Sequence, residues 1–322
     1  MKFISTISAV FAFLFSAYLI AQAESHDLQT DSLENLLSIE KDLDLRLDLL
    51  VKLMNLNNFR DKEKALEYAN QLFNESESLS PHVKNIKAQL FIAKSLQNKS
   101  KIDSSITILD KALEDAKAIN DITQIWNCYM YLGNASDMRN DLDGAYDYFL
   151  KGFNIHESIE SSEEKFRIKA TFGNNLGNNL NYNNEREEAL SYFKIASEAV
   201  DSLLTISPDN PSWIDMQGVI YTNLGGCYSD IQDEKTAIEY YLKSKELREV
   251  SGNTRGVLYC YMLLWSSYGT LGQFDKITDN AESVMKMANE YGGLYQDNEV
   301  QQQVKTVGNK IVMAFNNKLA SR

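Results

Sequence analysis

The sequence is poor in the residues that interrupt helices. Only 3 prolines occur among 322 residues, and all three (Pro81, Pro208 and Pro211) fall between segments whose apolar residues repeat at helical spacing. A helix has to stop at such positions because proline lacks a backbone donor and clashes with the preceding turn. Alternating apolar and polar runs, which would indicate strands, are absent. The sequence therefore predicts an all-α protein.

The sequence also has few residues that build metal, disulfide or catalytic centres. The 3 histidines (His26, His82 and His156) lie far apart, and no C-x2-C or H-x3-H spacing occurs, so we expect no metal site and no cofactor. Phosphate-loop and nucleophile-elbow motifs are missing, which argues against an enzyme. An enzyme whose site is assembled from distant residues stays a third alternative. We expect Cys128, Cys227 and Cys260 to be buried, unpaired apolar residues.

Basic residues are outnumbered, because 32 Lys and Arg stand against 45 Asp and Glu, a net charge of −13. Such a surface repels nucleic acid and anionic lipid, so we expect no nucleic-acid partner. The single long apolar run, residues 3–20, follows Lys2 and precedes Ala21-Gln22-Ala23. This pattern predicts a signal peptide over residues 1–23, cleaved after Ala23, and a periplasmic or secreted mature chain without stable membrane insertion. An uncleaved membrane anchor is the alternative.

A short pattern recurs along the remaining chain. A Leu-Gly pair is followed, twelve residues after the glycine, by Ala-x3-Phe or Ala-x3-Tyr. We call the glycine position the marker. The strongest copies pair Gly133 with Ala145, Gly177 with Ala189, and Gly225 with Ala237; weaker copies pair Leu53 with Ala65, Ala93 with Ser105, and Trp265 with Ile277. The constant spacing indicates a fixed turn between two helices. We expect the two paired positions to be where those helices approach most closely.

This pattern resembles the tetratricopeptide repeat family, in its longer variety of about 40 residues and its exported bacterial type. The resemblance implies a right-handed α-solenoid of about six helix-turn-helix repeats over residues 45–292. Residues 24–44 would lead into it, and residues 293–322 would supply a capping helix, near 298–318, and a tail. The resemblance further implies a non-enzymatic scaffold that binds a peptide or protein segment in its concave groove. A sensor acting on an envelope signalling protein is an alternative, and the oligomeric state stays open.

In the family, the positions three and two before the marker and one after it face the groove. Asn174, Asn175 and Asn178 occupy them in the fourth repeat, while Asn223 and Asn134 are equivalents in the fifth and third. Amides donate and accept at once, so this Asn column could hold the backbone of an extended peptide. Alternatively, the amides bond across neighbouring helices and hold the stack in register.

Three apolar or aromatic side chains extend this candidate surface. We assign Met130, Tyr182 and Tyr259 to groove positions, where they could contact a ligand. Met262 is expected on the same face. Lys87 and Lys94 could provide one local positive spot in the second repeat.

Overall fold

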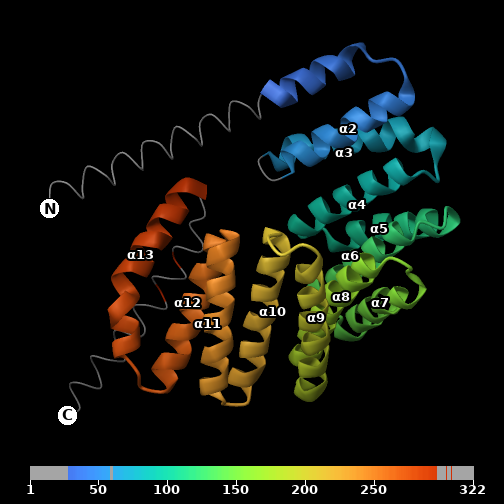
Figure 1. The fold of residues 1–322 in the computed structure, drawn as a ribbon. Helices are drawn as coiled ribbons and strands as arrows, with labels where there is room; N and C mark the ends of the chain where they lie inside the picture. Colours follow the sequence, from blue (N-terminus) through green and yellow to red (C-terminus); the bar gives the residue numbers. More distant parts are fainter. Residues whose placement is uncertain (1–27, 59–60, 296–301, 303–305, 307–322) are drawn as a thin grey trace, which may run out of the picture. The chain divides into compact units, whose positions relative to one another are not determined.

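The computed structural model describes residues 28–58, 61–295, 302 and 306 of the chain (Figure 1). Helices joined by short turns make up the described residues, and no strand occurs among them. The prediction of an all-α repeat fold is confirmed. The predicted signal peptide and nearly all of the predicted capping helix lie outside these residues. None of the described helices is both long enough and apolar enough to cross a membrane.

The chain divides after Asn140 into two compact units. In the first unit, residues 28–39 are helical and are followed by five helices: α2 (Leu43–Asn57), α3 (Lys62–Ser76), α4 (Val83–Asn98), α5 (Ile102–Ala118) and α6 (Ile122–Met138). The second unit holds seven described α-helices: α7 (Leu142–Asn154), α8 (Ser162–Tyr182), α9 (Arg186–Ile206), α10 (Pro211–Asp230), α11 (Glu234–Ser251), α12 (Thr254–Thr270) and α13 (Asp275–Tyr295). Short 3-10 helices, η1 (Glu77–Leu79) and η2 (Ile155–Ser158), follow α3 and α7.

The helices follow the predicted repeat register. Each marker lies on an even-numbered helix from α2 to α12, and the residue twelve positions later lies on the helix that follows. The third pair, α6 and α7, is divided between the two units. Within each unit, consecutive helices pack against one another, which is how a repeat buries an apolar face that it cannot bury alone (Figure 1).

The turn inside the pairs is as constant as the spacing predicts. Seven residues after the marker, the backbone is left-handed in five pairs, at Ser100, Asn140, Asn184, Gln232 and Gly272, with φ between 57° and 69°. In four of these pairs the next residue donates its N–H to a carbonyl five residues earlier, as in Glu185 to Leu180 at 2.9 Å. This arrangement satisfies carbonyls at the end of the first helix.

The close approach between paired helices differs from the prediction. A Cβ added at Gly177 would lie 2.6 Å from the ring of Phe193, and one at Gly225 would lie 2.5 Å from the ring of Tyr241. These aromatic residues lie sixteen positions after the marker, so the nearest neighbours are not the predicted Ala189 and Ala237. Glycine is required at both positions because any side chain there would meet a buried ring.

The structure shows two further features at the ends of the described repeats. Residues 28–39, in the predicted lead segment, form a helix that α2 holds through Arg46, whose Nη1 donates to the carbonyl of Leu37 at 2.8 Å. At the other end, α13 continues through Gly292 to Tyr295, past the predicted boundary at 292.

Candidate functional site

Four of the five asparagines in the predicted column lie on neighbouring helices of the second unit, and two of these four bond to each other. Nδ2 of Asn223, on α10, donates to Oδ1 of Asn174, on α8, at 2.8 Å. Both side chains are half-buried. Asn174 and Asn223 therefore fit the alternative interpretation, in which the amides bond across neighbouring helices.

A second polar bridge joins the same two helices. Nδ2 of Asn181, on α8, donates to Oδ2 of Asp230, on α10, at 3.2 Å. The buried Asn179 also bonds within the unit, since its Nδ2 donates to the carbonyl of Leu142 at 2.9 Å. Sequence reasoning missed Asn179 and Asn181 because neither occupies one of the three positions that face the groove in the family. Their spacing of two and four residues after the marker was the available signal.

Asn175 and Asn178 differ from these structural amides. Both are half-buried on α8, and the described residues supply no hydrogen bond to either side chain. Near the end of the same helix, Tyr182 leaves 77% of its surface exposed, and Tyr259 on α12 leaves 47% exposed. The second unit therefore presents two amides without a hydrogen-bond partner among the described residues and two partly exposed phenol rings.

The other predicted site residues have different surroundings. Met130 and Asn134 are half-buried on α6, which belongs to the first unit. The placement of Met262 on the groove is wrong. This side chain is 8% exposed and packs against Trp265 and Leu258 in the core of the last pair.

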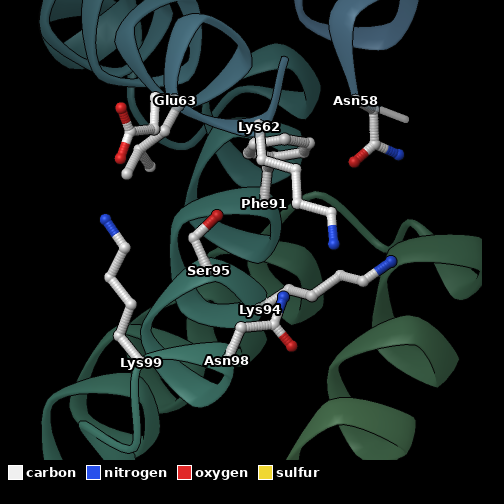
Figure 2. A pocket seen from close by; sticks show the side chains of 9 residues that line it. Asn58, Lys62, Glu63, Phe91, Lys94, Ser95, Asn98 and Lys99 are labelled. Carbon is white, nitrogen blue, oxygen red and sulfur yellow. The ribbon is translucent and has the colours of Figure 1, made fainter. Parts of the chain in front are cut away.

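The first unit contains a cavity of about 300 Å³ between α3 and α4 (Figure 2). Phe91 and Leu66 supply apolar surface, and Lys62, Lys94 and Lys99 supply positive charge. Figure 2 shows Lys62 and Lys94 on one side of the opening and Lys99 on the other, with Ser95 between them. The three ammonium groups form no ion pair with any described residue. Lys94 thus contributes to the predicted positive spot, whereas Lys87 does not line the cavity.

Burial determines the protonation state of two cysteine thiols. Burial raises the pKa of the Cys128 thiol to about 12 and that of Cys227 to about 11, so both stay protonated and unreactive near neutral pH. The three cysteines are buried and unpaired, which confirms that prediction. No group of three His, Cys, Asp or Glu side chains among the described residues is close enough to hold a metal ion.

Comparison with known proteins finds solved structures with a similar fold. No protein-family model and no curated protein matches the chain. A Rap protein solved in complex with Competence and Sporulation Factor is 17% identical, with 93% of this chain and 82% of that chain covered and a TM-score of 0.64. BtubC from P. vanneervenii is 18% identical, with coverages of 72% and 93% and a TM-score of 0.60.

A third structure names the repeat type. It is a signal-transduction ATPase from Pyrococcus horikoshii with a tetratricopeptide repeat sensor, 15% identical, covering 86% of this chain and 44% of that chain with a TM-score of 0.57. The fold is that of tetratricopeptide-repeat proteins. Identities this low establish the fold, and the ligand has to be inferred from the residues themselves.

Proposed function

We propose that the chain is a non-enzymatic scaffold that binds an extended peptide or protein segment across α8 and α10. The observation that carries this proposal is that some asparagines of α8 bond within the unit and others do not. Asn179 and Asn181 bond within the unit, whereas the amides of Asn175 and Asn178 are left with their capacity to donate and accept. A peptide backbone offers the complementary N–H and C=O groups, so such amides can bind a peptide whatever its side chains are.

The surroundings of these amides support the same proposal. The bond between Asn223 and Asn174 uses one donor and one acceptor, which leaves the Nδ2 of Asn174 and the Oδ1 of Asn223 for a ligand. The exposed ring of Tyr182 offers apolar contact at the end of α8. A Rap protein of the same fold has been solved with Competence and Sporulation Factor, which is consistent with ligand binding by such an array.

Peptide selection followed by a binding measurement tests the proposal. Residues 24–322 would be exposed to a random peptide library, and a selected peptide would then be titrated by fluorescence anisotropy. Loss of two hydrogen bonds in Asn175→Ala/Asn178→Ala should weaken binding by about five- to a hundredfold. The control Asn70→Ala, on exposed α3 surface of the first unit, should leave the affinity unchanged. Failure to select any peptide, or equal binding by the double variant, would refute the proposal.

We also propose that residues 1–23 direct export and are removed after Ala23. The charged start, apolar run and Ala-Gln-Ala sequence support this. Mass spectrometry of the chain recovered from a bacterial periplasmic fraction should give Glu24 as its first residue. Recovery of the intact chain from the membrane fraction would instead favour the uncleaved anchor.

A further inference from the structure

Arg248, near the end of α11, is a buried arginine without a partner. The residue is 7% exposed, and its Nε has no hydrogen bond. Among the described residues, no hydrogen bond from its guanidinium and no ion pair with it occurs. Burying a charge without a partner is costly, so proteins rarely retain one without a use.

Two glycines make room for this side chain. A Cβ added at Gly256, on α12, would lie 2.5 Å from Nη1 and 2.5 Å from Cδ of Arg248. A Cβ added at Gly218, on α10, would lie 3.0 Å from Cγ and 3.4 Å from Nε. The guanidinium therefore lies in a slot between α10 and α12, directly against backbone.

The repeat register shows that this combination is specific to one place. Arg248 lies eleven residues after Ala237, the residue paired with the marker Gly225. The other five repeats have uncharged or weakly basic residues at the equivalent position: Ser76, Ala116, His156, Val200 and Ala288. The positions of Gly218 and Gly256 lie seven and nine residues before their markers. Every other repeat has a larger side chain at both: Arg46, Ile86, Trp126, Ala170 and Leu258 at the first, and Asp44, Lys84, Gln124, Ile168 and Met216 at the second. The arginine therefore occurs in the one repeat whose two neighbouring positions, Gly218 and Gly256, are both glycine.

One helix N-terminus adds positive charge beside the slot. Gly256 is in the first turn of α12, a helix of 17 residues whose N-terminus carries partial positive charge. Asn253 caps this end, since its Oδ1 accepts the N–H of Gly256 at 2.8 Å. The nearby acid, Asp215 on α10, accepts from Nδ2 of Asn253 at 2.7 Å and forms no ion pair with Arg248. The exposed Glu249 is paired with Lys245 at 2.8 Å.

We propose that Arg248 is the centre of an oxyanion-binding site between α10 and α12, which takes a carboxylate or phosphate group. A planar guanidinium matches both groups through two parallel hydrogen bonds, and the N-terminus of α12 adds electrostatic attraction. The site is separate from the amides of α8, and the proposal does not depend on peptide binding there.

Thermal unfolding in defined anions tests the proposal with residues 24–322. Sodium phosphate and sodium citrate would each be titrated at constant ionic strength against sodium chloride. At least one should raise Tm saturably by about 3 °C or more, because a ligand that binds only the native state stabilises it. The anion that acts identifies the class of oxyanion. The absence of a saturable rise with either anion would overturn the proposal.

Substitutions test whether the anion-dependent rise in Tm comes from binding in the slot around Arg248. In Arg248→Met, the saturable rise should disappear, whereas Lys243→Met, an equal loss of charge from exposed α11 surface, should retain it. If Arg248→Met does not fold, Arg248→Lys keeps the charge without the planar fork and should raise the midpoint concentration at least about tenfold. If the saturable rise in Tm persists unchanged in the Arg248 variant, the anion does not bind at Arg248 and the proposal is wrong.

Discussion

At the scale of single residues, the asparagines of α8 separate into two groups that the sequence presents as one column. Asn174 reaches Asn223 on the neighbouring helix, whereas Asn175 and Asn178 have no such partner among the described residues. A change to alanine removes a bond in the first group and improves helix propensity in the second. Substitution should therefore lower stability in the first group and should not lower it in the second.

Asn174→Ala and Asn223→Ala should each lower the free energy of unfolding by about 0.5–1.5 kcal/mol, with a measurable coupling between them. Asn175→Ala/Asn178→Ala should leave stability unchanged or raise it. Urea unfolding of the single and double variants measures both effects. Additive losses in the first pair would mean that its bond does not form in solution.

Gly177 provides a second prediction at this scale. Gly177→Leu should lower stability by about 1–3 kcal/mol, because the new side chain has to displace the buried ring of Phe193. Gly226→Ala is the matched control on α10, since its Cβ would meet nothing within 4 Å. It should stabilise the protein by about 0.5–1 kcal/mol through helix propensity. Equal melting temperatures for both variants would show that the repeat register is misplaced.

At the scale of elements, Arg46 joins three segments of the first unit. Its Nε and Nη2 donate to both carboxylate oxygens of Glu75, on α3, at 2.9 and 2.8 Å. Its Nη1 donates to the carbonyls of Leu37 and Glu40. One side chain on α2 thus connects the helix at 28–39 with the first predicted pair.

This connection should depend on pH. The hydrogen bonds from Arg46 lower the pKa of Glu75 below its usual 4.5, so the carboxylate is stabilised by folding. Its contribution is complete above about pH 4.5 and is lost as the pH falls through the lowered folded pKa.

Glu75→Gln should therefore cost about 1–2 kcal/mol at pH 7, and the difference from the unsubstituted chain should shrink below pH 4.5. Urea unfolding at several pH values measures this, with Glu67→Gln on the exposed face of α3 as control. A difference that stays constant down to pH 3 would mean that the charge of Glu75 does not stabilise the fold.

At the scale of the whole molecule, contacts connect helices that are close in sequence. The stability of such an array is approximately a sum of repeats and nearest-neighbour interfaces, so a local defect has local consequences. The chain also divides into two units, with the markers of the first three pairs in one and those of the last three in the other.

Gly177→Leu should therefore increase amide hydrogen exchange in α8 and α9, next to the defect, and leave α2 to α5 protected as before. Hydrogen exchange read by mass spectrometry measures protection helix by helix. Gly226→Ala again serves as control. A uniform loss of protection in both units would show that the chain unfolds as one cooperative block.

The sequence by itself determined the class of fold and the register of its repeats. The twelve-residue spacing fixes where each pair turns, because a left-handed residue has to follow the first helix at a constant distance. These properties depend on neighbours in the chain, and local patterns record them.

Only the tertiary structure decided which polar residues are used internally. The bond between Asn174 and Asn223 joins residues 49 positions apart, and the ring against Gly177 comes from Phe193. The isolation of Arg248 likewise depends on two glycines from different helices. Hydrogen bonds and close contacts depend on distances between helices of a few ångströms, which a pattern of residue types along one chain does not specify.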